Sequence, residues 1–164
     1  MFPRQLGTRE TAKDRTHKTA ALRPSKAEVI HLHFASVPLF AACSKRDLKL
    51  LAKTAIVEPR AAGATLVTEG ETGTNAYVIL QGKCRVLRKG RRVGEIVAGG
   101  IVGELSMLNR APRNATVVAE TPLEVAVLGR RDFLALLESS PSISLKLLES
   151  LAARVQDLDA RTPV

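Results

Sequence analysis

The chain has 164 residues, enough for one domain with a normal core, and 45% of them are hydrophobic. No apolar run approaches the roughly 18–20 residues of a membrane span, and no signal-peptide stretch opens the chain. These features predict a cytoplasmic location. The formal net charge is +9, and it is concentrated near the N-terminus, where residues 1–26 hold seven basic and two acidic residues.

Residues 1–25 are polar and basic, lack apolar periodicity and are predicted to be a disordered tail. Such a tail keeps a protein soluble or contacts an acidic partner such as RNA or a membrane surface, and both interpretations stay open. A capping-box spacing at Ser25 predicts a short helix to about Phe34, and Ser44 is the expected cap of a second helix. Residues 26–53 are therefore predicted to form an N-terminal helical pair.

Residues 55–129 change character, because short β-branched segments alternate with glycine-containing turns and no long helix interrupts them. Seven to eight short strands at this spacing predict an antiparallel sandwich or barrel. The strand segments are expected at 56–60, 65–67, 76–80, 83–88, 91–96, 115–120 and 124–128.

Two helices are predicted in residues 130–160. Phe133 and its neighbours form the apolar face of the first, and Ser140-Pro141 begins the second, because proline suits the first helical position. An apolar stripe along the second helix could dock on the sheets or pair with a second copy of the chain; it consists of Ile143, Leu147, Leu151, Val155 and Leu158.

The most informative stretch is Gly99–Thr116, which contains the only predicted helix inside the β region. Gly103 precedes Glu104 at the start of that very short helix, and Arg113 follows nine residues later, ahead of a strand. Backbone amides at a helix N-terminus plus one guanidinium form an anion site, while a carboxylate accepts hydrogen bonds from sugar hydroxyls. The pair therefore suggests a ligand with both a phosphate and a ribose.

The pattern Gly100-x-x-Gly103-Glu104-Leu105-Ser106, followed by Pro112-Arg113-Asn114-Ala115-Thr116, resembles the phosphate-binding cassette of the cyclic-nucleotide-binding domain family. Tyr77-x-Ile79-x-x-Gly82 and Leu128–Phe133 are similar to flanking motifs of the same family. The resemblance covers about residues 30–158 and implies a mainly β fold, a double-stranded β-helix of the jelly-roll type, with flanking helices. It also implies a bacterial stand-alone sensor for a cyclic nucleotide, more often cyclic AMP than cyclic GMP.

The resemblance implies a role for each cassette position. Glu104 would accept the ribose 2′-hydroxyl, Arg113 would pair with an equatorial phosphate oxygen, and five amides would complete the cradle: those of Gly103, Glu104, Leu105, Ser106 and Ala115. Asn114 departs from the alanine, serine or threonine common at its position. Asparagine can donate and accept, so the choice between cyclic AMP and cyclic GMP stays open.

The base pocket is less specific in the sequence. Cys84, Val86, Leu105 and Val117 are candidates for its apolar floor, although each could equally be ordinary core. Candidates for a lid come from the last helix, where Leu147, Leu148 or Leu151 could cover the base by apolar contact and Arg154 by stacking.

Enzymatic alternatives find little support in the sequence. Metal-dependent enzymes on a similar roll need histidine and carboxylate ligands on strands, but His17, His31 and His33 all precede the β region. No nucleophile–base set is recognisable, so neither a catalytic residue nor a metal or cofactor is predicted. Because about six residues follow Leu158 in the sequence, no DNA-binding helix-turn-helix is expected after the last helix.

The predicted role is a sensor that acts in trans on an unidentified partner protein, with a homodimer through the last helix as one arrangement. Two alternatives stay open: a roll that binds proteins without nucleotide, and nucleic-acid contact through the basic tail. Cys43 and Cys84 are expected to be reduced, buried thiols.

Overall fold

The computed structural model describes residues 28, 31, 32, 34, 35, 37, 40, 41 and 43–161. The predicted tail, residues 1–25, lies outside the described residues, as does the helix cap expected at Ser25. Residues 28, 31, 32, 34 and 35 are helical, in agreement with a short first helix.

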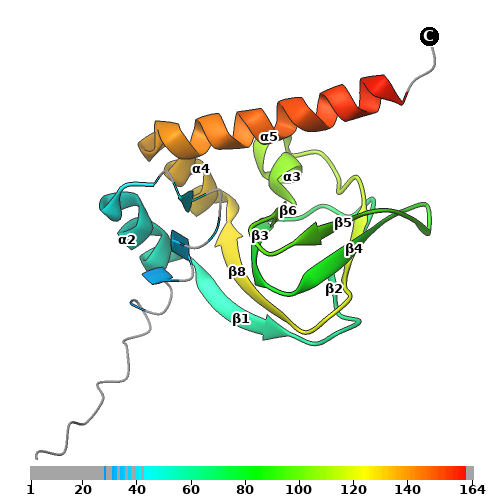
Figure 1. Ribbon diagram of the computed structural model, residues 1–164, viewed down its shortest axis with the longest axis horizontal. Coiled ribbons are helices and arrows are strands. Elements are labelled where there is room, and N and C mark those ends of the chain that lie inside the picture. The colour runs from blue at the N-terminus through cyan, green and yellow to red at the C-terminus, as the bar shows by residue number, and fades with distance from the viewer. Residues whose placement is uncertain are drawn as a thin grey trace, which may run out of the picture.

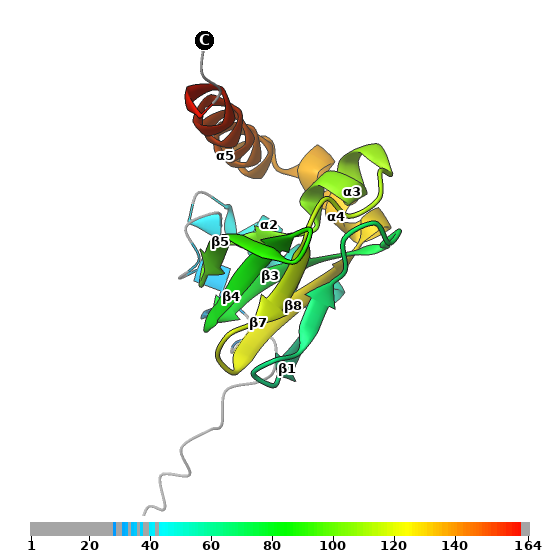
Figure 2. The same cartoon turned by 90° about the vertical axis from the view of Figure 1, so that its right-hand side faces the viewer.

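Within the described residues, eight antiparallel strands form two four-stranded sheets, which confirms the predicted fold class. The first sheet has the order β1-β8-β3-β6 and the second β2-β7-β4-β5. Figures 1 and 2 show the two sheets facing each other, with the helices at one side of the roll. The strands are β1 (Ile56–Arg60), β2 (Thr65–Val67), β3 (Asn75–Gln81), β4 (Lys83–Arg88), β5 (Arg91–Val97), β6 (Ile101–Val102), β7 (Thr116–Ala119) and β8 (Leu123–Gly129).

The helices begin where the sequence indicated. The helix α2 (Lys45–Thr54) has a complete capping box, in which the Ser44 hydroxyl accepts from the Asp47 amide and the Asp47 carboxylate accepts from the Ser44 amide. After the strands come α4 (Arg130–Ser139) and α5 (Pro141–Ala160), and the short α3 (Glu104–Asn109) interrupts the roll. No helix of the described residues is long and apolar enough to cross a membrane.

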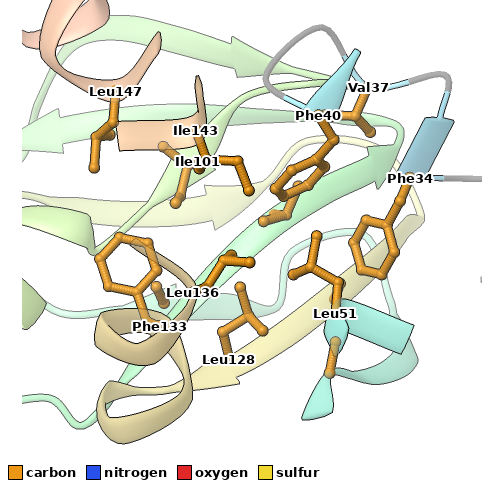
Figure 3. Close-up of a cluster of buried hydrophobic side chains, with 14 of the residues drawn as sticks. Phe34, Val37, Phe40, Leu51, Ile101, Leu128, Phe133, Leu136, Ile143 and Leu147 are labelled. Atoms are coloured by element: carbon orange, nitrogen blue, oxygen red, sulfur yellow. The ribbon is translucent and has the colours of Figure 1, made fainter. Parts of the chain in front are cut away.

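The inner strand β3 is buried on both faces of the first sheet, since its successive side chains point to opposite sides and both sides are covered. Val78 of β3 packs toward the helices, whereas Ile79 packs between the two sheets, and both are fully buried. Figure 3 shows the helical side of this arrangement, where aromatic and aliphatic side chains of the N-terminal helical residues, α2, α4 and α5 meet the sheet. Met107 of α3 belongs to the cluster on the helical side, so α3 packs on that side of the first sheet.

The two cysteines are free thiols in the structure. Cys84 is buried between the sheets and Cys43 is half-buried beside α2. Burial raises the pKa of each thiol to about 11, and the nearby carboxylates, Glu120 for Cys84 and Asp47 for Cys43, act in the same direction.

Candidate functional site

The short helix α3 is anchored to the first sheet at its N-terminal side. The strand β6 pairs with β3, with Val102 opposite Tyr77, and the chain then turns at Gly103, whose φ of 84° is left-handed. Glycine adopts this φ without the steric penalty of a side chain. Glu104 follows as the first helical residue, and its side chain is only 3% exposed.

Arg113 is a buried cation that no carboxylate pairs with among the described residues. It is 7% exposed, and its two terminal nitrogens donate to backbone carbonyls: Nη1 to Gly103 O at 2.9 Å and Nη2 to Asn75 O at 2.6 Å. Burial lowers the pKa of Arg113, and Tyr77 and Glu104 oppose that shift. An arginine stays charged in proteins, so this guanidinium places an incompletely compensated positive charge beside the start of α3.

The β2–β3 loop holds the backbone of Arg113 in place. The amide of Gly70 donates to Arg113 O at 2.8 Å, and the Arg113 amide donates to Glu71 O at 2.8 Å. These bonds span about forty residues of sequence, so the loop and the cassette form one unit that aims the guanidinium.

Two glycines leave the space that the guanidinium occupies. A Cβ added to Gly73 would lie 2.0 Å from Arg113 Nη2, and one added to Gly103 would lie 2.1 Å from Nη1. Gly73 has no left-handed φ, so alanine suits its backbone and only the arginine has to move.

We therefore expect Gly73→Ala to displace the guanidinium and to weaken anion binding about tenfold or more, because misplacing a charged hydrogen-bond donor loses much of its 1.5–3 kcal/mol. Titration calorimetry with cyclic AMP measures this. Gly129→Ala is the matched control, since its added Cβ meets only Asp132 Oδ2 at 3.9 Å. Equal affinities of the two variants would contradict the positioning role of Gly73.

A pocket of about 410 Å³ opens in front of α3 and Arg113, within the range of about 300–1,000 Å³ typical of small-molecule sites. Three parts of the chain form most of its lining: the cassette, both strands of the β4–β5 hairpin, and the end of α5. Its lining comprises residues 101–106 and 113–115 of the cassette, Val67, Val86, Arg88, 93–96 and Val117 of the strands, Arg154, Asp157 and Leu158 of α5, and Arg161 just after that helix.

The pocket contains most of the predicted site residues. All seven cassette candidates line it, namely Gly103, Glu104, Leu105, Ser106, Arg113, Asn114 and Ala115, and so do Val86, Val117 and Arg154. Asn114 is exposed at the pocket.

Four candidates for the base floor or lid lie elsewhere. Cys84 is fully buried between the sheets, deeper along β4 than the pocket reaches. Leu147 and Leu151 pack into the helical core, and Leu148 is 62% exposed on the outer face of α5. The helix packs through the Ile143–Leu147 side, which turns Leu148 outward and leaves Arg154 nearest to the cassette.

The terminal helices contact α3 at both of its ends. Arg154 Nη1 of α5 forms an ion pair with Glu104 Oε1, and Arg130 Nε of α4 donates to Met107 O at 2.9 Å. The Glu104 carboxylate, which was expected to accept a ribose hydroxyl, is thus already paired with a residue of the last helix. α5 crosses above α3 in Figure 1, which agrees with this pair.

Sequence reasoning missed Asn75, Gly73 and Arg130. Asn75 contributes a carbonyl oxygen, which any residue has, and Gly73 contributes space, so neither side chain carries a signal in the sequence. Arg130 stands in the motif that was used to place α4, but its contact with α3 depends on how α4 packs.

A family model, the cyclic nucleotide-binding domain, matches residues 58–140. A cAMP-dependent protein kinase regulatory subunit of Eremothecium gossypii is 39% identical over 103 residues, covering 62% of this chain and 22% of that protein. A cGMP-dependent protein kinase of Caenorhabditis briggsae is 39% identical over 101 residues, covering 56% and 14%. The chain thus spans about a fifth of the length of the kinase regulatory subunit that it matches.

Solved structures of the same family resemble this chain in fold. The catabolite activator protein of Thermus thermophilus superposes with a TM-score of 0.68 at 28% identity, over 75% of this chain and 60% of that one. A cyclic nucleotide-binding domain from Methylobacillus flagellatus has a TM-score of 0.68 at 28% identity, over 84% and 85%. The fold and the cassette define a nucleotide-binding regulatory class, and the chain belongs to the cyclic nucleotide-binding domain family.

Proposed function

We propose that the chain is a cyclic-nucleotide sensor that binds cyclic AMP in preference to cyclic GMP and has no catalytic activity of its own. The observation that carries this proposal is Arg113, a buried guanidinium with only carbonyl partners, beside the buried carboxylate of Glu104. A cyclic phosphate would supply the missing negative charge, and a ribose hydroxyl would donate to the carboxylate.

The base would lie along the strands. Val86 and Ile96 supply apolar lining on that side of the pocket, and no described lid residue of α5 at the pocket is aromatic. The preference for cyclic AMP draws support from relatives such as the regulatory subunits named for cAMP, although a cGMP-dependent kinase matches at a similar identity. The expected bacterial, stand-alone character stays a prediction.

Titration calorimetry with cyclic AMP, cyclic GMP and 5′-AMP tests the function. We expect heat and a raised melting temperature with both cyclic nucleotides, the larger effect with cyclic AMP, since a 100-fold excess over Kd stabilises a protein by about 2.7 kcal/mol. 5′-AMP matches the base and ribose but lacks the cyclic ester. No heat and no melting shift at millimolar cyclic nucleotide would instead favour a roll that contacts proteins alone.

We further propose that the ligand acts by replacing Arg154 as the partner of the Glu104 carboxylate. Binding of the 2′-hydroxyl would release α5 from α3, and α4 would follow because Arg130 holds the Met107 carbonyl. The re-packed helices would then present a new surface to a partner protein in trans.

Arg154→Ala tests this release. We expect its cyclic AMP affinity to rise about two- to fivefold, because a partly exposed ion pair that competes with the ligand is worth about 0.2–1 kcal/mol. Lys146→Ala on the same helix, whose side chain pairs with Glu149, is the control and should leave the affinity unchanged. A weaker affinity of Arg154→Ala would show that Arg154 contacts the nucleotide directly.

A homodimer through α5 stays a proposal, supported by apolar side chains on its outer face. Leu145, Leu148 and Val155 are 59%, 62% and 56% exposed. Sedimentation equilibrium of Leu148→Glu and the unaltered chain, with and without cyclic AMP, tests it; identical monomer masses in all four samples would reject the dimer.

A further inference from the structure

The hairpin of β4 and β5 carries a concentration of positive charge, and Arg88 is the one basic residue of residues 83–92 that also lines the nucleotide pocket. Every residue of β5 except Ile96 is exposed, and β5 is the edge strand of its sheet. Residues 83–92 contain no acidic residue and six basic ones, which are Lys83, Arg85, Arg88, Lys89, Arg91 and Arg92.

Two basic residues of the hairpin, Lys83 and Arg92, are paired with acidic neighbours. Arg92 Nη1 lies 2.8 Å from Glu120 Oε1, and its Nη2 lies 3.2 Å from Glu95 Oε2. Lys83 Nζ lies 3.8 Å from Glu120 Oε2. These three pairs account for two of the six basic residues, and the charge of Arg85 also acts on the Glu120 carboxylate.

The tip of the hairpin, which carries Arg88, Lys89 and Arg91, differs from these two paired residues. Within the described part of the chain, the side chains of Arg88, Lys89 and Arg91 form no ion pair. One carboxylate reaches the tip, and it binds backbone: Glu69 Oε2 accepts from the Lys89 amide at 2.8 Å. The tip therefore presents three cations to solvent.

These cations stand at positions where folding favours other residues. Arg88 lies directly opposite Arg91 in the register, and like charges in that position destabilise a hairpin. Lys89 has a φ of 48° and Gly90 a φ of 73°, the combination of a two-residue type I′ turn, in which asparagine is preferred to lysine before the glycine. Local choices that oppose the fold indicate a role other than folding.

We propose that this tip binds double-stranded DNA, with the hairpin in the major groove and Arg88, Lys89 and Arg91 on the phosphates. A two-stranded β-ribbon fits the major groove of B-DNA, and arginine forms bidentate bonds with phosphate. Binding of single strands relies on aromatic stacking, and a membrane surface on exposed aromatic or bulky apolar anchors. No aromatic side chain of the described residues is exposed, and the exposed apolar side chains of β5 are Val93 and Val97, which are shorter than the Trp, Phe or Leu anchors of membrane-binding surfaces. Duplex DNA therefore fits the tip better than either.

Fluorescence anisotropy of a labelled 24-base-pair duplex, titrated with the full chain at several salt concentrations, tests the proposal. The double variant Lys89→Gln/Arg91→Gln should bind about tenfold more weakly at 0.1 M salt, and its salt slope should fall by about 2, one for each lost phosphate contact. Lys45→Gln/Arg46→Gln removes the same charge from exposed positions of α2, on the opposite side of the molecule in Figure 1, and should retain the affinity and slope of the unaltered chain.

A second variant separates binding from folding. Lys89→Asn suits the turn, so we expect a higher melting temperature together with weaker DNA binding. Unaltered affinity and slope in Lys89→Gln/Arg91→Gln, or an equal loss in the α2 control, would overturn the proposal. A parallel titration uses vesicles that contain phosphatidylserine. The proposal would also be overturned if the unaltered chain did not bind the duplex and the tip variant lost binding to these vesicles.

Discussion

Arg113→Gln should bind cyclic AMP about 10- to 100-fold more weakly than the unaltered chain. The substitution removes the buried positive charge beside the pocket and the guanidinium that the carbonyls of Gly103 and Asn75 hold there. A charged hydrogen bond to the phosphate would contribute about 1.5–3 kcal/mol. Calorimetric titration measures the loss directly. The fold should persist, because glutamine retains one donor group for the carbonyl of Gly103 or Asn75.

Arg131→Gln provides the matched control for Arg113→Gln. Arg131 is an exposed arginine on α4 and does not line the pocket, so the same change in net charge should leave the affinity unchanged. If both variants lost the same affinity for cyclic AMP, the loss would come from the change in net charge and not from a contact of Arg113 with the phosphate. An unchanged affinity in Arg113→Gln would remove the main support for the phosphate site.

Glu104→Ala should weaken cyclic AMP binding by one to two orders of magnitude. Its carboxylate is 3% exposed and would be the acceptor for the ribose 2′-hydroxyl, and its removal also leaves Arg154 without its partner. The test uses 2′-deoxy cyclic AMP beside cyclic AMP. The unaltered chain should bind the deoxy ligand more weakly, whereas Glu104→Ala should bind both ligands with nearly equal affinity.

Glu138→Ala, an exposed acid on α4, controls for the loss of a negative charge and should retain the preference for cyclic AMP. If Glu104→Ala still discriminates between the two ligands as the unaltered chain does, the ribose is held by another residue and the assignment of Glu104 is wrong.

The order of strands and helices could be predicted because its signals are local. Glycines at the turns separate short β-branched segments, and Ser44 with Asp47 marks the start of α2, so seven of the eight strands and the later helices were expected close to their observed positions. The strand β6 was missed as a separate element, because two residues are too few for periodicity and only pairing with β3 defines it.

The chemistry of the cassette was equally local. Glu104 follows a glycine at the start of a short helix, and Arg113 lies nine residues on, so a phosphate and ribose site could be proposed from that stretch alone. The lid could not be resolved in the same way. Several residues of the last helix were candidates, and only the packing of α5 through Ile143 and Leu147 turns Arg154 toward Glu104.

The succession of elements and the two charged residues of the cassette could be predicted without a structure, because capping, turn formation and side-chain chemistry act over a few residues. Tertiary structure alone decided what surrounds Arg113. The carbonyl of Asn75 lies 38 positions away in the chain, and the space beside Gly73 exists only because the β2–β3 loop is hydrogen-bonded to the cassette. Backbone oxygens and empty space have no residue-type signature, so their contribution appears only when the chain has folded.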